Sequence, residues 1–276
     1  MTSHPVYGRI GGTVALIGLG SIGKGTLPLI QRHFEVERLV VVEPREEAAA
    51  FLAEQGIPHV QAALTPENYA QVLGEVFAGG GGFCVNLSVD TDSLDLMRWC
   101  RANGTLYIDT VVEPWAGYYF GTEDNAQRTN YALRQEVRDE KAAHPGGTTA
   151  VSCCGANPGM VSWFVKEALL RLAADLGREV AAPEGRDGWA RLMRDLGVKG
   201  VHIAERDTQA RRRPRPRGVF VNTWSVEGFI AEGFQPAELG WGTHETWFPE
   251  TGHRHDDGCM ASVWIERPGA ITRVHT

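Results

Sequence analysis

Three glycines, Gly18, Gly20 and Gly23, stand in the spacing Gly-x-Gly-x-x-Gly between a short apolar run and a segment with helical apolar spacing. Gly18 would permit a tight turn, Gly20 would let the backbone approach a pyrophosphate, and Gly23 would let helix and strand pack closely. The N-terminus of the following helix would offer free N–H groups and a partial positive charge to phosphates. The motif alone is weak evidence, but its place between a strand and a helix indicates a dinucleotide site.

An acidic residue ends the second apolar run. Glu43 stands 20 residues after Gly23 (43 − 23 = 20), where a carboxylate accepts hydrogen bonds from the hydroxyls of the adenosine ribose. A carboxylate here repels a 2′-phosphate, so the sequence favours NAD over NADP, and Arg45, two residues on, leaves NADP open. The alternative is a glycine-rich turn with an incidental glutamate.

The first 110 residues alternate short apolar strands with helices, a pattern typical of right-handed βαβ units and a parallel sheet. We expect strands at residues 14–17, 39–42, 59–61, 82–86 and 106–109, and helices at 22–33, 45–55, 65–77 and 92–101. Beyond them we expect helices at 125–143, 161–176 and 189–196, and strands at 149–152, 201–204 and 261–265. The sequence therefore predicts an α/β fold: a Rossmann-type parallel sheet in an NAD-binding domain over residues 1–150, and a second, α+β substrate domain over 151–276.

Ligands of an open α/β sheet bind beyond the carboxyl ends of its strands. Three further polar segments, 86–90, 109–115 and 155–159, stand at such ends. Helix capping and turn formation explain these residue types equally well, so spacing alone leaves both interpretations open. The residues that we expect around the cofactor are Gly18, Gly20, Ser21, Ile22, Gly23, Glu43, Asn86, Ser88, Asp109, Thr110, Ala156 and Asn157.

Composition narrows the class of protein. The chain has 276 residues, 43% of them hydrophobic, and a net charge of −7, an ordinary balance for a globular protein. No apolar run approaches the roughly 20 residues that span a bilayer, and the first residues lack the pattern of a signal peptide. We therefore expect a cytoplasmic protein that binds neither membrane nor nucleic acid, and we interpret the basic run 211–217 as a solvated loop.

Other chemistries have less support. A cluster near the end of the chain, made of His253, His255, Asp256, Asp257 and Cys259, has the residue types of a metal site, but its spacing matches no standard zinc pattern. The five cysteines include no CxxC pair, and the sequence has no Gly-x-Ser-x-Gly motif. We expect no metal, no redox dithiol and no covalent hydrolase chemistry.

Several longer runs carry a more specific signal, namely NLSVDTDSLDLMRWC, YIDTVVEPW, TTAVSCCGANPGMVSWFVKEAL, HIAERDTQ, FVNTWSVEGF and PAELGWGT. From about Pro5 to the last residue, the sequence resembles bacterial homospermidine synthases, which are related to saccharopine and carboxynorspermidine dehydrogenases. Members of that family are considerably longer, so the resemblance implies that a C-terminal portion is absent from this chain.

The resemblance implies aminobutyl transfer with NAD as a bound redox helper. Putrescine would lose a hydride and give an imine, a second putrescine would displace ammonia and form a new imine, and return of the hydride would release homospermidine without net oxidation. The transfer would take place between two putrescines, or between putrescine and spermidine. The same resemblance implies the residues of the catalytic site: Trp224 against the cationic intermediate, Glu205 and Glu232 on the substrate amines, and Glu113, Asn157 and Asp90 nearer the nicotinamide. We expect putrescine and related polyamines as partners, and a homodimer.

Two alternatives remain open. One is a net oxidoreductase of the saccharopine or carboxynorspermidine dehydrogenase type, which would need a basic clamp for a carboxylate where the matched segments offer acids. The other is a non-catalytic NAD-binding protein. Without the resemblance, we would interpret Trp224 as a core residue and each of the candidate catalytic acids as an exposed charge.

Overall fold

The computed structural model describes residues 4–120, 125–206, 208, 212–235, 239–240, 247–248, 250–254 and 262–265. The chain divides into two compact units, residues 1–154 with 218–236, and residues 155–217 with 237–276. The boundary that we propose from the sequence, at residue 150, lies close to the first change of unit. Residues 218–236 belong to the first unit although they follow a long stretch of the second.

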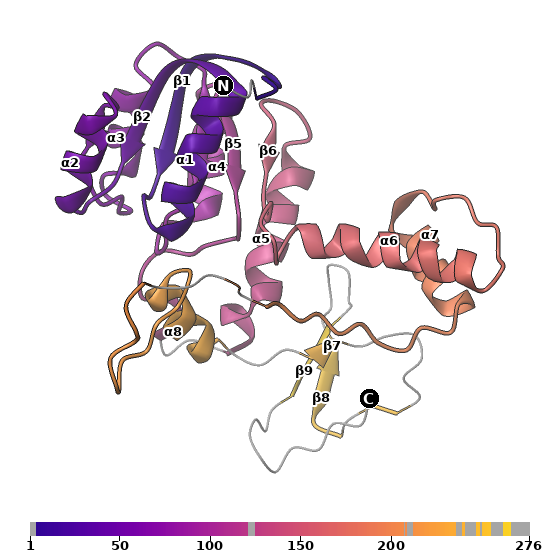
Figure 1. Ribbon diagram of the computed structural model, residues 1–276. Helices are drawn as coiled ribbons and strands as arrows, with labels where there is room; N and C mark the ends of the chain where they lie inside the picture. Colours follow the sequence, from indigo (N-terminus) through magenta and orange to yellow (C-terminus); the bar gives the residue numbers. More distant parts are fainter. Residues whose placement is uncertain are drawn as a thin grey trace. The chain divides into compact units, whose positions relative to one another are not determined.

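The first unit is built on a six-stranded parallel sheet, which confirms the expected α/β, Rossmann-type fold (Figure 1). The strand order is β3-β2-β1-β4-β5-β6. The first three strands therefore extend the sheet to one side of β1, and the next three, starting with β4, extend it to the other side. The strands are β1 (Gly8–Ile17), β2 (Phe34–Val42), β3 (His59–Val60), β4 (Phe83–Asn86), β5 (Leu106–Asp109) and β6 (Ala150–Val151). Because all pairings are parallel, the carboxyl ends of these strands share one edge of the sheet.

Helices cover both faces of this sheet. Those that follow the first five strands are α1 (Ser21–His33), α2 (Glu47–Glu54), α3 (Tyr69–Val76), α4 (Ser93–Ala102) and, after a longer connection, α5 (Asn130–Ala143). Val14 and Leu16 of β1 pack in one core with residues of α1 and α2, whereas Ala15 and Ile17 pack in the other with residues of α3 and α4. Consecutive strand residues point to opposite faces, so an unbroken apolar run is what a sheet covered on both sides requires.

Some element boundaries differ from those predicted. β1 and β2 start earlier than their apolar runs, because their polar first halves pair with each other while remaining largely exposed. The helix expected over 125–143 is divided into a 3₁₀ turn, η2 (Asn125–Arg128), and α5, because Thr129 caps α5 by accepting a hydrogen bond from the Ala132 N–H. The strand expected at 201–204 is wrong. These residues have no regular secondary structure, and Val201 and Ile203 are both exposed.

A 3₁₀ turn, η1 (Tyr118–Phe120), and helix α8 (Val226–Phe234) complete the first unit. The rings of Phe120 and Phe234 lie 4.9 Å apart. The side-chain amide of Asn130 donates a hydrogen bond to Gln235, just beyond the end of α8, at 3.0 Å. These contacts hold α8 on η1 and on the start of α5.

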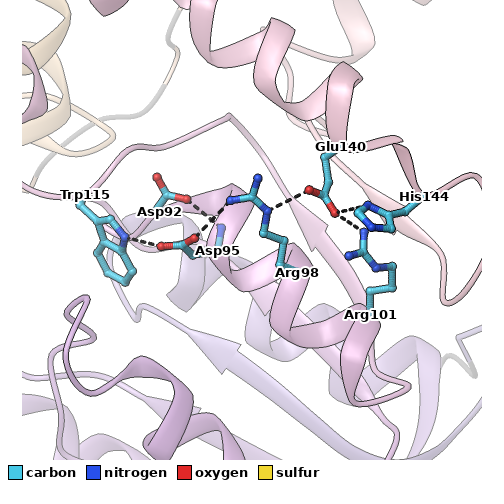
Figure 2. Close-up of polar contacts among 7 residues, drawn as sticks. All are labelled: Asp92, Asp95, Arg98, Arg101, Trp115, Glu140 and His144. Atoms are coloured by element: carbon cyan, nitrogen blue, oxygen red, sulfur yellow. Dashed lines mark hydrogen bonds and ion pairs between the residues drawn. The ribbon is translucent and has the colours of Figure 1, made fainter. Parts of the chain in front are cut away.

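A charged network ties α5 to α4 (Figure 2). Glu140 of α5 accepts hydrogen bonds from Arg98, at 2.9 Å, and from Arg101 of α4. His144 Nδ1 lies 3.0 Å from the same carboxylate. The hydrogen bond from Arg98 is the largest influence on the pKa of Glu140. Burial, the next largest, raises this pKa, but the hydrogen bonds from Arg98 and Arg101 and their charges outweigh it and lower the pKa to about 2. Glu140 is therefore the ionised centre that joins the two helices.

The network continues to the segment after β5 (Figure 2). Arg98 also lies 3.7 Å from Asp95, and the Asp95 carboxylate accepts the indole N–H of Trp115 at 2.8 Å. The N-terminus of α4 is capped by Asp92, which accepts a hydrogen bond from the Asp95 N–H at 2.8 Å. These bonds anchor Trp115, two residues after Glu113, to α4.

The second unit contains helices α6 (Met160–Asp175) and α7 (Gly185–Asp195) and a three-stranded antiparallel sheet. The sheet consists of β7 (Leu239–Gly240), β9 (Ser262–Ile265) and β8 (Gly252–Arg254), in that order. Helices and an antiparallel sheet agree with the expected α+β class. In the part of the chain that the structure describes, no helix has the length and hydrophobicity needed to cross a membrane.

Candidate functional site

The glycine loop lies between β1 and α1, as its spacing predicts. Gly18 has a φ of +88°, and a Cβ added to it would lie 2.8 Å from the Ser88 backbone. A Cβ on Gly23 would lie 2.3 Å from the Gly18 carbonyl oxygen, whereas a Cβ on Gly20 would meet no atom within 4 Å. Two glycines are therefore required by packing, and the third, Gly20, faces open space. Ser21 and Ile22, which open α1, are both exposed beside it.

Glu43 directly follows β2 and its side chain is 4% exposed. Its carboxylate accepts hydrogen bonds from the Leu19 N–H in the glycine loop at 2.6 Å and from Arg45 Nε at 2.6 Å. Burial raises the pKa of Glu43, but the hydrogen bonds from the Arg45 side chain and from the backbone N–H groups of Leu19 and Arg45 outweigh it and leave the pKa below its ordinary value. An ionised carboxylate thus holds the loop from the side where an adenosine ribose would bind. Glu43 lies at the end of the second strand, as the sequence predicts, but the sequence did not indicate that Arg45 would pair with it.

Asn86 and Asp109 end β4 and β5, and both are buried. The Asn86 side-chain oxygen accepts hydrogen bonds from the N–H and hydroxyl of Ser88, at 3.2 and 2.5 Å. Its amide donates to the Tyr107 hydroxyl at 3.2 Å, and that hydroxyl donates to Asp109 at 3.0 Å. The two strand ends are joined through the Tyr107 hydroxyl. Thr110, partly buried, follows Asp109 directly.

The Asp109 carboxylate also holds the end of β6. It accepts hydrogen bonds from the Ser152 hydroxyl at 2.9 Å and from the Cys153 N–H at 2.7 Å. Cys153 adopts a φ of 59°, and this N–H bond is one constraint on that turn. Burial raises the pKa of Asp109, and the hydrogen bonds oppose the rise. Asn86 and Asp109 are thus engaged within the protein, and their direct contact with a cofactor stays a prediction.

Three carboxylates, those of Asp90, Asp109 and Glu232, lie within electrostatic range of Glu113, which follows β5. Burial, followed by the charges of Asp90, Asp109 and Glu232, raises the pKa of Glu113 to about 8. Desolvation and the nearby charge of Glu227 also raise the pKa of Asp90. The predicted residues Asp90 and Glu232 therefore lie within electrostatic range of Glu113, and a cation bound there would offset their negative charge.

Helix α8 contributes Glu232 to this cluster, and Trp224 lies just before its cap residue, Ser225. The Trp224 indole packs at 64° against Phe229, with ring centroids 6.2 Å apart. Trp224 is 37% exposed, which argues against a role as an ordinary core residue. An accessible indole beside a helix that carries acids is suited to a cationic ligand.

Tyr119 lies near Glu113, at a position that the sequence did not indicate as part of a candidate site. It is buried in η1, its hydroxyl is hydrogen-bonded to the Gln235 side chain, and it lies within electrostatic range of Glu113 and Glu232. Burial, followed by the charge of Glu113, raises its pKa. Its hydroxyl therefore stays protonated and available as a hydrogen-bond donor. The run Tyr-Tyr-Phe around it has no periodicity that distinguishes it from packing residues.

The remaining predicted residues, Ala156, Asn157 and Glu205, are exposed residues of the second unit. Ala156 and Asn157 lie in a tight turn that precedes α6, in which the Gly155 N–H donates to the Pro158 carbonyl at 2.9 Å. Glu205 lies in the irregular stretch before residue 207. Their roles remain predictions drawn from the resemblance.

Most residues of the candidate metal-binding cluster near the end of the chain lie outside the part that the structure describes. His255, Asp256, Asp257 and Cys259 lie outside the described residues, and only His253 of that cluster is within them. Among the residues that the structure does describe, no three His, Cys, Asp or Glu side chains come close enough to hold a metal ion.

The strand order, the glycine loop after β1 and the acid after β2 define a Rossmann-type dinucleotide-binding domain. The chain belongs to the saccharopine dehydrogenase family: residues 14–151 match the saccharopine dehydrogenase NADP binding domain, and residues 155–276 match the saccharopine dehydrogenase C-terminal domain.

Its similarity to homospermidine synthases is confirmed by relatives of that name. The chain is 60% identical over 279 residues to homospermidine synthase of Mesorhizobium japonicum and 58% identical over 281 residues to that of Blastochloris viridis. These alignments cover 99% and 100% of the chain, but only 58% and 59% of the relatives. The crystal structure of Legionella pneumophila homospermidine synthase in complex with NAD matches with a TM-score of 0.78 at 34% identity, covering 94% of this chain and 55% of that one.

Proposed function

We propose that the chain binds NAD and catalyses the homospermidine synthase reaction: aminobutyl transfer between two putrescines, with release of ammonia and no net oxidation, or between putrescine and spermidine. The observation that carries the proposal is the carboxylate cluster around Glu113, beyond the sheet edge that bears the glycine loop. Because the chain spans about three fifths of the relatives it matches, the activity of the whole protein is itself part of the proposal.

The residues present fit a dinucleotide. The open space at Gly20 leaves room for a pyrophosphate at the N-terminus of α1, and Glu43 supplies the acidic group beside the ribose. A bound nicotinamide would supply reversible hydride transfer at the amine-bearing carbon of the substrate. The protein must therefore bind a diamine, orient it and manage its protons.

A diamine suits the cluster because each of its amines is a cation at neutral pH. The negative charges of Asp90, Asp109 and Glu232, which disfavour ionisation of Glu113 in the free protein, would be offset by the ligand. The open face of Trp224 would add about 0.5–1 kcal/mol in contact with water and about 2 kcal/mol when desolvated. In the second unit, Glu205 and Asn157 are proposed as further polar contacts, as the resemblance implies.

Hydride leaves only from a neutral amine, so a protein group must first accept a proton. An ordinary glutamate, with a pKa of about 4.3, is some 6 units below an alkylammonium, with a pKa of about 10.4. Glu113, with a pKa of about 8, lies within about 2 to 3 units of it. We assign the proton acceptor to Glu113, which is largely protonated at neutral pH in the free protein and must first lose its proton when the cationic diamine binds.

The test is incubation of the purified chain with NAD and putrescine, with mass analysis of the amines and absorbance at 340 nm. Homospermidine formed without accumulation of NADH is the expected result. Putrescine deuterated at its amine-bearing carbons should keep its deuterium in the product, because the transferred hydride returns. The homologous Mesorhizobium japonicum protein serves as a positive control.

Other outcomes would favour the alternatives. NADH that accumulates in proportion to substrate would indicate a net oxidoreductase. NAD binding without any change in the amines, under conditions in which the control is active, would indicate that this chain binds the cofactor but does not catalyse the reaction. Glu113→Gln should lower turnover at least a hundredfold while leaving the Kd for NAD within about twofold.

The proposal includes two expectations that come from the sequence, a homodimer and a cytoplasmic location. Light scattering on the purified chain tests the first, since a dimer should have twice the 30.2 kDa mass of one chain. Cell fractionation tests the second.

A further inference from the structure

The choice between NAD and NADP depends on the charge at the end of β2. A free carboxylate there accepts the ribose 2′-hydroxyl and repels a 2′-phosphate. In this chain the carboxylate is not free, because Arg45 holds it. The matched family domain is described as binding NADP, whereas the solved relative contains NAD. The comparisons therefore do not decide which of the two cofactors this site prefers.

The acceptor positions of Glu43 are filled by protein donors. One carboxylate oxygen accepts from the Leu19 N–H at 2.6 Å and from Arg45 Nη2 at 3.3 Å. The other accepts from the Arg45 N–H at 3.1 Å and from Arg45 Nε at 2.6 Å. A carboxylate has about four acceptor positions, so a ribose hydroxyl can bind Glu43 only by sharing or displacing one of these donors.

The guanidinium is the donor that can move. The two backbone N–H groups are fixed by the glycine loop and by the end of β2, whereas the Arg45 side chain is 56% exposed. Arg45 Nη2 also donates to the Leu19 carbonyl at 3.0 Å. The guanidinium thus spans Glu43 and the glycine loop, beside the position of the adenosine ribose.

We propose that Arg45 is a specificity-determining residue that weakens discrimination against a 2′-phosphate, because its guanidinium neutralises Glu43 and can turn to bind that phosphate. Arginine suits both tasks, since its planar fork forms two parallel hydrogen bonds to either a carboxylate or a phosphate. The inference rests on the proposed dinucleotide site and adds the residue that sets its preference.

The test is calorimetric titration of the full 276-residue chain with NAD and with NADP, and with the smaller probes AMP and 2′,5′-ADP, which lack the nicotinamide half. Arg45→Ala should raise the ratio Kd(NADP)/Kd(NAD) at least tenfold, because Glu43 then faces the phosphate unopposed. Glu43→Gln should lower the same ratio at least tenfold. Arg45→Lys should fall between the wild type and Arg45→Ala, since lysine keeps the charge but not the fork.

Arg171→Ala is the matched control, because it removes a comparable arginine–glutamate pair, with Glu167 at 2.6 Å, from the surface of α6. Its ratio should equal that of the wild type. If Arg45→Ala does not fold, as judged by circular dichroism, Arg45→Gln carries the same prediction. A ratio that changes less than threefold in these variants while both dinucleotides still bind would overturn the inference and leave the proposed function standing. If the folded wild-type chain binds neither dinucleotide, both fail.

Discussion

Gly18 and Ser88 are in direct backbone contact: a Cβ built on Gly18 would lie 2.8 Å from both the nitrogen and the Cα of Ser88. Gly18 follows β1 and Ser88 follows β4, the two strands between which the order of the sheet reverses. The glycine loop is therefore positioned by the neighbouring strand as well as by its own.

The first prediction separates the two roles of the glycines. Gly18→Ala should lower the free energy of unfolding by about 2 kcal/mol or more, because a positive φ costs an L-residue about 1–2 kcal/mol and the methyl group also meets the Ser88 backbone. Gly20→Ala should cost less than about 1 kcal/mol, because its methyl group enters open space, yet it should weaken NAD binding at least tenfold. Urea unfolding and NAD titration measure the two effects. Equal stability losses in both variants would contradict the assignment.

The second prediction concerns the pH dependence of stability. The folded-state pKa of Glu113, about 8, lies above the ordinary value of 4.5, so the folded state holds this proton more tightly than the unfolded state. The associated stability is fully present below about pH 4.5 and is lost as pH rises through 8, with a slope of at most about 1.4 kcal/mol per pH unit. Glu113→Gln should remove this slope and be more stable than the wild type at pH 8. Urea unfolding at pH 5, 6, 7 and 8 checks it, and parallel curves for the two proteins would count against the raised pKa.

The third prediction concerns the network of Figure 2. Glu140→Gln should lower the free energy of unfolding at pH 7 by about 1–3 kcal/mol, because Arg98 and Arg101 lose their ionised partner. Arg98 is half exposed, so solvent screening keeps the effect moderate. Since the folded pKa of about 2 is below the ordinary value of 4.5, the difference from the wild type should shrink as pH falls from 4.5 towards 2.

Glu167→Gln is the control for that prediction. Its pair with Arg171 has the same chemistry, but both side chains are largely exposed, so its loss should cost less than about 0.5 kcal/mol. Similar losses in the two variants would show that the network adds nothing beyond a surface ion pair.

The fourth prediction tests whether Asp109 acts through the protein or through the cofactor. Asp109→Asn should cost about 1–3 kcal/mol, because one of the donors among Tyr107, Ser152 and Cys153 loses its acceptor in a buried site. Tyr107→Phe removes a single donor to Asp109 and should cost less. Thermal unfolding and NAD titration of both variants distinguish the roles. A fully stable Asp109→Asn variant with weakened NAD binding would instead favour direct contact with the cofactor.

The glycine loop and the acid after β2 could be predicted from the sequence because their signals are local. The glycine spacing and the acid at the end of β2 depend only on the order of residues along one strand-turn-helix unit. The residues of the proposed substrate site could not be predicted in this way. Helix α8 contains Gly228 and Gly233, which lower helix propensity, although Ser225 gave it a cap residue.

Long-range contacts account for the other omissions. The pairing of Arg45 with Glu43 needs the geometry of the turn after β2, and the burial of Tyr119 depends on α8, which is more than 100 residues away in the sequence. The prediction of a strand at 201–204 was wrong. Val201 and Ile203 alternate as in an amphipathic strand, but this pattern does not show whether a partner strand is present. Only the resemblance indicated Trp224 and Glu232.

The return of residues 218–236 to the first unit has a practical consequence for cloning. A gene fragment that stops at residue 154 would encode all six parallel strands and the glycine loop, but it would leave out Trp224, Glu232 and the partners of Phe120 and Asn130. Such a fragment would report on cofactor affinity alone. A minimal expression unit that includes the proposed amine-binding residues must either extend through residue 236 or rejoin that helix through a designed linker.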